Sequence, residues 1–496
     1  MIAVVYARFL DTDFVGTDSL PVVQASQVHS WADFVGLWTQ PLMGSTDFVV
    51  SQAVFYRPIA SLVFALDGWL WGADPFGYHV TNVALQVAAT LLAYAVLRQL
   101  RLGWPAALLG AAVLGLHPTM VTAVPVIARR YDALSAALLF GALALLCRDG
   151  AIWLRTASLV LFGASLLAKE SAFAAIPLLP LVLLAAWFTP EASARAARDA
   201  YMRRVAPFVV LGVVIFAIRF AVLGGDLGGH RDVDIVSTNF EEYRVMLNRY
   251  ILFVFWPFHQ FYPDHTVGWV ALVVGIVGVL GAALTFADAR TRMLVGVGLA
   301  WTMGFGAFFI LLRHIAGPWY MYYPLLGVAL ALGAAAEGVW LSLKQRARIE
   351  TVGSAALGVL AGIYTFGSLT TSPLVRPYAE WHAAGLVMRE YLAGIKACTQ
   401  DMPSEISVTL WNSPELYDDG SDESALLAAT MLEGFTYGAY MHLIRPDQHF
   451  NLYIGQPLTY HSAPPDLQMS CGWGGPDRRR VIATSATLPA PQFPTD

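Results

Sequence analysis

The stretch GYHVTNVALQVAATLLAYAVL, residues 77–97, runs for 21 residues without an aspartate, glutamate, lysine or arginine. A helix needs about 20 mostly apolar residues to cross the core of a bilayer, so this stretch predicts a membrane-spanning helix. Of the 496 residues in the chain, 57% are hydrophobic and only 13% are charged, and the mean hydropathy is +0.57. Soluble domains carry about 25% charged residues. The sequence therefore predicts an α-helical polytopic membrane protein and argues against a soluble enzyme.

Further apolar stretches predict about 10–11 spans in total. Besides 77–97 they are 105–125, 132–148, 152–168, 172–188, 206–224, 268–287, 293–312, 318–340 and 351–371. Met1 to Leu10 is only half a span and is interrupted by Arg8. It is either a short anchor or the end of a first helix truncated by a late start codon. It has no basic n-region or small-residue cleavage site, so we do not expect a removable signal peptide.

The distribution of basic residues predicts the orientation in the cytoplasmic (inner) membrane, because cytoplasmic loops are enriched in arginine and lysine. Five short alternate loops carry such residues: Arg98 and Arg101; Arg148 and Arg155; Arg195, Arg198, Arg203 and Arg204; Arg290 and Arg292; Lys344, Arg346 and Arg348. The 11–76 loop and everything after Thr371 are then extracytoplasmic. This assignment requires that 245–262 does not cross the bilayer. We interpret that stretch as interfacial or re-entrant, because aromatic residues crowd its second half.

Two domains are predicted. Residues 1–371 form the transmembrane domain, in which 53–72 is an amphipathic helix that starts beside Pro58 and lies along the membrane surface. Residues 372–496 form a small extracytoplasmic α/β or α+β module, with strands at 406–411, 451–454 and 480–488 and a helix at 422–443. Cys398 and Cys471 of this module could close a loop of about 74 residues or remain free thiols. Cys147, at the cytoplasmic end of a span, is expected to stay reduced.

Polar side chains near the external ends of the spans point to a functional site, since ionisable groups at membrane depth are costly. Each one alone could be an interfacial or capping residue. Together they predict a shared external cavity, and they comprise Asp18, Arg57, His79, His117, Arg129, Arg130, Asp132, Lys169, Glu170, Arg219, Arg313 and Tyr320. Such cations can hold the phosphate of a lipid carrier, and a carboxylate can act as general base for a hydroxyl. The net charge of −5 offers no surface for nucleic acid.

Other catalytic signatures do not occur in the sequence. It has no HxxxH or CxxC spacing, no Gly-rich loop typical of a nucleotide site and no GxSxG motif.

Four stretches together resemble the GT-C superfamily of polyprenyl-phosphate-sugar-dependent glycosyltransferases, and most of all the transmembrane part of O-mannosyltransferases that carry TPR repeats. They are FYRPIASLVFALDGWLWGADPFGYHVTNVALQ (55–86), LHPTMVTAVPVIARRYDALSAALLF (116–140), LLAKESAF (166–173) and YMYYPLLG (320–327). The resemblance covers residues 11–330. It departs from the family at Gln86, where a histidine is common, and before Tyr320, where the usual arginine is absent and Arg313, a few residues earlier, is the candidate substitute. No TPR repeats follow.

The resemblance implies a GT-C-like fold and a role for each matching residue. Family members carry a catalytic carboxylate in the first external loop, often in an acidic pair, and FVGTDSLPVVQAS (14–26) is the matching stretch. Asp18 is the residue carried over, with Asp11 and Asp13 as alternatives. The resemblance implies that the donor phosphate binds to Arg57, Arg129, Arg130, Lys169 and Arg219. It implies supporting positions at His79, Asn82, His117, Asp132, Glu170, Arg313 and Tyr320.

The predicted function is an inverting glycosyltransferase that moves a sugar, with mannose as one candidate, from a polyprenyl or dolichyl phosphate to an acceptor hydroxyl on the external face. The acceptor could be a protein, a glycan or a lipid. The resemblance neither requires nor excludes a divalent metal, and membrane lipids are expected partners. Two alternatives remain: a flippase or transporter of polyprenyl-linked glycolipids, which predicts midplane polar residues and inverted repeats, and a non-enzymatic membrane scaffold.

Overall fold

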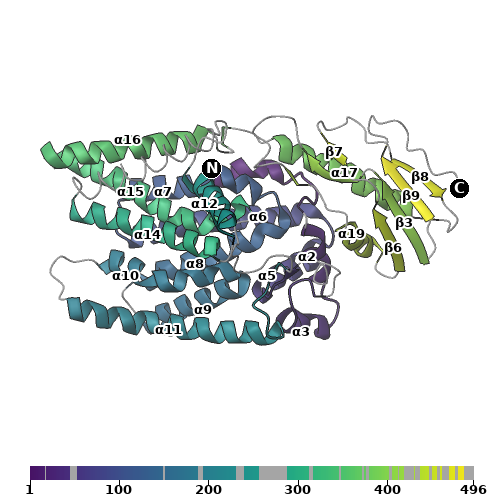
Figure 1. Cartoon of the computed structure of the whole chain (residues 1–496), viewed down its shortest axis with the longest axis horizontal. Helices are drawn as coiled ribbons and strands as arrows, with labels where there is room; N and C mark the ends of the chain where they lie inside the picture. Colours follow the sequence, from purple (N-terminus) through teal and green to yellow (C-terminus); the bar gives the residue numbers. More distant parts are fainter. Residues whose placement is uncertain are drawn as a thin grey trace. The chain divides into compact units, whose positions relative to one another are not determined.

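The computed structural model is predominantly helical and divides into two compact units (Figure 1). Unit 1 comprises residues 1–5, 84–123 and 131–377, and unit 2 comprises 6–83, 124–130 and 378–496. The structure describes residues 1–16, 18–44, 53–148, 151–187, 194–230, 239–255, 288–311, 317–345, 348–370, 372, 374–375, 379–400, 405–411, 413–417, 429–430, 436–445, 449–454, 458–460, 469–474 and 479–484. Because this division follows contacts between residues, the functional domain boundary at 371/372 stays a prediction.

Unit 1 is built from apolar helices. They are α1 (Ile2–Tyr6), α7 (Trp104–Leu116), α9 (Ile152–Ala168), α10 (Leu179–Trp187), α11 (Ala194–Val222), α12 (Phe240–Phe255), α14 (Ala289–Leu311), α15 (Tyr322–Gln345) and α16 (Arg348–Thr370), with strand β2 (Gly229–His230). The 3-10 segments η2 (Pro118–Thr122), η4 (Glu170–Leu178) and η5 (Pro318–Met321) adjoin α7, α10 and α15. Two helices, α6 (Pro75–Gln99) and α8 (Arg130–Leu146), begin in unit 2 and continue into unit 1 along the chain.

Nine of the ten predicted spans coincide with helices in the described part of the chain, and the remaining one, 268–287, lies outside the described residues. Within the same part, six helical segments are long and apolar enough to cross a membrane: Pro75–Gln99, Trp104–Thr122, Glu170–Trp187, Arg203–Val222, Ala289–Leu311 and Pro318–Lys344. The predicted polytopic helical class is therefore confirmed. The non-crossing stretch 245–262 begins in α12, and its residues after Phe255 are not described.

Small residues let the central helices of unit 1 approach closely. A Cβ added to Gly298 of α14 would lie 2.5 Å from the backbone oxygen of Gly327 in α15, and one added to Gly327 would lie 2.3 Å from the oxygen of Gly298. On another face of α15, a Cβ on Gly110 of α7 would lie 2.4 Å from the Ala329 oxygen. Backbone contact through small residues is typical of helix packing in membranes. It explains why α7 and α14 pack closely against α15 (Figure 1).

Unit 2 begins with short helical segments that precede α6. They are η1 (Ala7–Phe9), α2 (Ser19–Ala25), α3 (Trp31–Thr39) and α5 (Pro58–Trp71), with strand β1 (Ala53–Val54) before α5 and η3 (Ile127–Arg129) before α8. Local signals explain two of these starts. Ser30 and Asp33 form a reciprocal capping box at α3, and Pro58 occupies the first turn of α5. The predicted helix at 53–72 is thus present but begins at Pro58, because 53–54 are extended.

The C-terminal part of unit 2 is the predicted mixed α and β module. Strands β6 (His449–Ile454), β3 (Glu405–Trp411), β9 (Arg479–Thr484) and β8 (Met469–Gly474) form one sheet in this order. β3 is parallel to β6 and β9, and β8 is antiparallel to β9. A second sheet has the order β5 (Ala429–Thr430), β4 (Pro414–Tyr417), β7 (Leu458–Tyr460). The strands predicted at 406–411, 451–454 and 480–488 correspond to β3, β6 and β9, although 485–488 lie outside the described residues.

Two helices of this module differ from the sequence prediction. The helix predicted over 422–443 is wrong at Ala429–Thr430, which form strand β5, and is confirmed from Thr436, where α19 (Thr436–Ile444) begins. Residues 422–428 and 431–435 lie outside the described residues. Tertiary pairing of β5 with β4 overrides the local helical preference there. The second is α17 (Ala379–Thr399), a helix that the sequence did not predict. The side chains of Trp381, Met388 and Tyr391 in α17 are buried.

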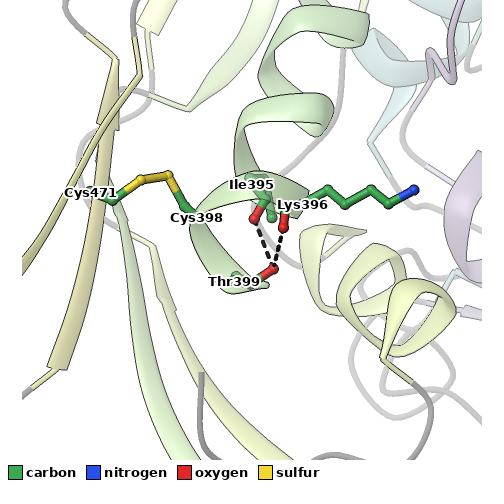
Figure 2. Close-up of a disulfide and its surroundings, with 5 residues drawn as sticks. All are labelled: Ile395, Lys396, Cys398, Thr399 and Cys471. Carbon is green, nitrogen blue, oxygen red and sulfur yellow. Dashed lines mark hydrogen bonds between the residues drawn. A yellow bond between two sulfur atoms is a disulfide. The ribbon is translucent and has the colours of Figure 1, made fainter. Parts of the chain in front are cut away.

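A disulfide ties α17 to the sheet. Figure 2 shows Cys398, near the end of α17, bonded to Cys471 of β8 with the two Cα atoms 5.7 Å apart. One residue further on, the Thr399 hydroxyl donates to the carbonyl oxygens of Ile395 and Lys396 and so closes the last turn of the helix. Of the two alternatives left by the sequence, the bridge is the correct one. Cys147 is a free, buried thiol, as expected.

Candidate functional site: an acidic segment and an arginine segment

The acidic segment 11–18 of unit 2 packs against the segment that carries Arg129 and Arg130. Gly16 has a φ of +87°, and an added Cβ would lie 2.3 Å from Cγ1 of Val126, so both the backbone conformation and the close contact require glycine. The backbone N–H of Ala128 donates to the Ser19 hydroxyl (3.3 Å). The fold thus brings the turn that contains Asp18 next to the predicted phosphate-binding arginines of the same unit.

The three candidate carboxylates of this segment have different surroundings. Asp11 is exposed, and its Oδ1 accepts a hydrogen bond from Arg389 Nη2 at 2.8 Å. Asp13 is half-buried, and its Oδ1 accepts from the backbone N–H of Phe14 at 2.7 Å. Asp18, also half-buried, occupies the N-cap position of α2, but its side chain makes no capping hydrogen bond. Asp18 is therefore not the simple helix-capping residue that the turn sequence allowed.

The carboxyl group of Asp13 has a shifted pKa. Burial raises its pKa from 3.8 to about 6, although the Phe14 N–H and the positive charge of Arg389 act in the opposite direction. The charge of Asp74 contributes to the rise. A carboxylate with a pKa near the working pH is a better proton acceptor than an ordinary one.

Arg130 lies at the centre of a buried polar cluster in unit 2. Its Nε donates to Asn82 Oδ1 (3.0 Å), its Nη1 to the Asp67 carboxylate and its Nη2 to the Tyr78 carbonyl (2.8 Å). The guanidinium also lies over the Phe64 ring, 4.2 Å from its centroid. Arg130 is 1% exposed. These contacts position the start of α8. They also show that Asn82, which the resemblance implied as a supporting residue, binds Arg130 directly.

Two supporting residues of α6 anchor neighbouring loops. Asn82 Nδ2 donates to the carbonyl oxygens of Val124 and Val126, both at 3.0 Å, and so holds the loop before η3. His79 is buried, and its Nε2 pairs with the Thr12 hydroxyl at 3.1 Å. One face of α6 therefore holds both the arginine segment and the acidic segment.

The other predicted cations of unit 2 border the same loops. Arg57 is buried at the N-cap position of α5, and its guanidinium lies 4.1 Å from the Phe55 ring centroid. Arg129 is half-buried at the end of η3. Both belong to elements that contact α2, the helix that begins directly after Asp18.

A polar cavity of about 310 Å³ lies between α2, α3 and α5. Its polar lining comes from Gln24, Gln27, Asp33, Gln40 and Ser61. Carboxamide groups both donate and accept hydrogen bonds, so such a lining suits a ligand rich in hydroxyl or amide groups.

In unit 1, Lys169 forms the centre of a second charged cluster. Its Nζ donates to Asp132 at the start of α8, and both side chains are buried. Nζ also lies 4.3 Å from the ring centroid of Tyr320 and 5.7 Å from that of Tyr131. The structure thus brings together three residues predicted from separate motifs, namely Lys169, Asp132 and Tyr320.

The remaining predicted residues of unit 1 occupy two further positions. Arg219 Nη1 lies 3.8 Å from the Glu170 carboxylate, and Arg219 Nη2 donates to the Leu227 carbonyl at 3.1 Å. Both ring nitrogens of His117 have protein partners: Nδ1 pairs with the Thr119 hydroxyl at 2.8 Å and Nε2 with the Tyr364 hydroxyl at 3.1 Å. His117 therefore has the environment of a structural residue. Arg313 lies outside the described residues.

Two charged residues that organise unit 2, Asp67 and Arg389, were not predicted from the sequence. Asp67 interrupts the apolar run 53–72, and this isolated carboxylate was a usable signal for a buried ion pair. Arg389 had no such signal, because its partner Asp11 is 378 residues away. Over the described ranges, no three His, Cys, Asp or Glu side chains are grouped as a metal site.

Comparison with known proteins supports the motif resemblance, although no protein-family model matches the chain. The chain is 30% identical over 147 residues to the human protein O-mannosyl-transferase TMTC4, covering 27% of this chain and 20% of that protein. It is 24% identical over 265 residues to the Caenorhabditis elegans protein O-mannosyl-transferase F38B6.6, covering 52% of this chain and 35% of that protein. The matches therefore span about a fifth to a third of the relatives' own length.

Two solved structures have low similarity to the whole chain. ArnT from Cupriavidus metallidurans, bound to undecaprenyl phosphate, is 16% identical with a TM-score of 0.46, covering 98% of this chain and 96% of that chain. The oligosaccharyltransferase AglB from Archaeoglobus fulgidus, in complex with an inhibitory peptide and a dolichol-phosphate, is 12% identical with a TM-score of 0.43, covering 93% and 64%. Similarity at this level assigns no function. The sequence matches to O-mannosyl-transferases are the stronger finding, and they confirm the resemblance of this chain to the GT-C membrane glycosyltransferases.

Proposed function

We propose that this protein is an inverting membrane glycosyltransferase that uses a polyprenyl- or dolichyl-phosphate sugar as donor. The observation that carries the proposal is the sequence match to curated protein O-mannosyl-transferases. The reaction forms a bond between the acceptor oxygen and the anomeric carbon, and it breaks the bond from that carbon to the phosphate oxygen. A base takes the proton of the acceptor hydroxyl, and the lipid phosphate leaves as an anion.

The departing phosphate needs fixed positive charge nearby, because charge develops on its oxygen in the transition state. The proposal assigns this role to Arg57, Arg129, Arg130, Lys169 and Arg219. Arg130 and Lys169 each pair with a buried carboxylate, and Arg219 lies 3.8 Å from the Glu170 carboxylate. We therefore expect these three residues to position their surroundings as well as to bind the phosphate.

The base is proposed to be a carboxylate of the acidic segment. Asp18 is the residue that the resemblance carries over, and its side chain does not cap α2. Asp13 is the competing candidate because its pKa of about 6 makes it a good proton acceptor near neutral pH. Asp11 is the weakest of the three, since it is exposed and paired with Arg389.

The acceptor is proposed to enter the cavity between α2, α3 and α5, because its amide and hydroxyl lining suits either a sugar or a peptide. Reaction on the external face of a cytoplasmic membrane is supported by the Cys398–Cys471 bridge. Disulfides persist in oxidising compartments and are rare in the cytosol.

The proposal is tested by reconstituting the purified protein in liposomes with radiolabelled mannosyl-phosphoryl-polyprenol and a membrane extract as acceptor. We expect label to appear in one of the protein, glycan or lipid fractions, which also identifies the acceptor class. Asp18→Asn and Asp13→Asn are compared, because loss of a general base costs about 10²–10⁴-fold in rate. Transport of the labelled lipid without transfer would instead indicate a flippase, and activity in both variants would remove both residues as the base.

A further inference from the structure

Helix α17 of the C-terminal module contacts the acidic segment directly through Arg389. The Nη2 of Arg389 donates to the backbone oxygen of Asp11 at 2.5 Å and to its Oδ1 at 2.8 Å. One guanidinium nitrogen therefore binds both the main chain and the side chain of the same residue. Such a contact restrains the backbone of Asp11 in a way that a side-chain ion pair alone would not.

Gly385 lies one helical turn before Arg389, on the same face of α17. A Cβ added at Gly385 would lie 2.7 Å from the Cβ and 3.2 Å from the Cα of Thr12. Because one of these atoms is the Cα of Thr12, the backbone of Thr12 would have to move to make room. Glycine at this position allows the helix to lie directly against the residue between Asp11 and Asp13.

Thr12 is held from its other side as well. Its hydroxyl donates to the Phe9 carbonyl at 2.7 Å and pairs with His79 Nε2 of α6 at 3.1 Å, and the residue is buried. The segment 11–13 is therefore fixed between α6 and α17, both within unit 2 over these residues.

We propose that α17 is a positioning element of the acidic segment, in which Arg389 and Gly385 set the placement of residues 11–13 for the transfer reaction. This inference rests on the proposed function. It gives the C-terminal module a role in catalysis at the first external loop, and it makes Arg389 a positioning residue that need not touch substrate.

The charges around Asp13 make the role of Arg389 measurable. Arg389 of α17 lowers the pKa of Asp13, whereas burial and the charge of Asp74 raise it. Tyr440 of α19 also lies within electrostatic range of Asp13, and burial raises the pKa of its hydroxyl above the ordinary value of 10. The fourth neighbour is His79 of α6, through Thr12. Removal of the Arg389 charge should therefore raise the pKa of Asp13 further.

The ion pair is exposed at both ends, with 40% of the Arg389 side chain and 76% of the Asp11 side chain accessible to solvent. Exposed pairs contribute little to stability. We therefore expect Arg389→Gln to fold normally and to change the reaction rather than the amount of folded protein.

The test compares Arg389→Gln, Arg389→Lys and Gly385→Ala in the liposome transfer assay. Gly472→Ala of β8 is the matched control, because its added Cβ would meet no atom within 4 Å. Misplacing a catalytic group by about 1 Å can cost up to about 100-fold, so we expect Arg389→Gln to lower kcat by about 10–100-fold with KM little changed. Arg389→Lys should recover part of this loss. If Asp13 is the base, the acid limb of the pH–rate profile moves to higher pH in Arg389→Gln and stays in place in Gly385→Ala.

Hydrogen–deuterium exchange of peptides covering 7–16 provides a readout that does not depend on activity. Faster exchange in Arg389→Gln and Gly385→Ala than in wild type and Gly472→Ala is the expected result. Wild-type exchange in both variants, or wild-type kcat in both, would overturn the positioning role. Absence of transfer by the wild-type protein would overturn the proposed function instead, and the exchange data would still decide whether α17 restrains the segment.

Discussion

The buried pair between Arg130 and Asp67 predicts a large stability effect from a single isosteric substitution. Asp67→Asn keeps the shape of the side chain but removes its charge, and so leaves the Arg130 guanidinium uncompensated. The Asp67 side chain is only 4% exposed and that of Arg130 0%, so solvent cannot replace the lost partner. Breaking a buried pair at one end costs about 3–5 kcal/mol.

The matched control is a pair of the same charge type on the surface. In α12, Arg244 Nε lies 2.7 Å from the Glu241 carboxylate, but these side chains are 59% and 64% exposed. Glu241→Gln should cost about 0.5 kcal/mol or less, because water screens the charge and solvates the remaining partner. The two substitutions thus differ mainly in burial.

The assay is thermal unfolding of the purified protein in detergent, followed by intrinsic fluorescence. A loss of about 3–5 kcal/mol corresponds to a fall of roughly 6–20 °C in Tm, at about 2–4 °C per kcal/mol for a unit of 150–250 residues. The double variant Arg130→Met with Asp67→Leu should be more stable than Asp67→Asn alone, since no uncompensated charge remains. A Tm for Asp67→Asn within about a degree of the Glu241→Gln value would refute the burial argument.

Three further predictions concern the termini and the loops. Cys398→Ser should lower the free energy of unfolding of the module by about 4 kcal/mol in the chain-entropy model for a loop of this size. A wild-type unfolding midpoint that stays the same when the bridge is reduced would contradict this expectation. Asp13 has a raised folded-state pKa of about 6, so the folded state binds more protons and stability should fall as pH rises from about 4 to about 6. Asp13→Asn should abolish that slope in a pH series of melting temperatures. Single cysteines introduced into the 189–204 loop and into the C-terminal module can be labelled in intact cells. We expect the loop to stay unlabelled and the module to be labelled, and the opposite pattern would show that the predicted orientation is reversed.

Composition and hydropathy alone predicted the class of the protein and most of its helices. Nine of the ten apolar stretches that predicted spans coincide with helices in the described part of the chain, because a bilayer requires about 20 apolar residues per crossing and no tertiary contact changes that length. The motif residues were found in the same way. Lys169, Asp132 and Tyr320 come from three stretches, and the structure joins them in one cluster. Polar residues at span ends are visible in sequence because their surroundings are apolar.

The contacts within unit 2 were decided only by the tertiary structure. Ala429–Thr430 became a strand through pairing with β4, against the helical pattern of the surrounding sequence. Asp18 and Asp13 cannot be ranked from their sequence neighbours, since the pKa of Asp13 depends on burial and on Arg389, which lies far away in the chain. Hydrophobic periodicity and motifs indicate the contacts of a residue within one helical turn and the apolar length needed to cross a bilayer. They carry no information about which distant helix covers an exposed loop, because such packing depends on shape and charge brought together only by folding.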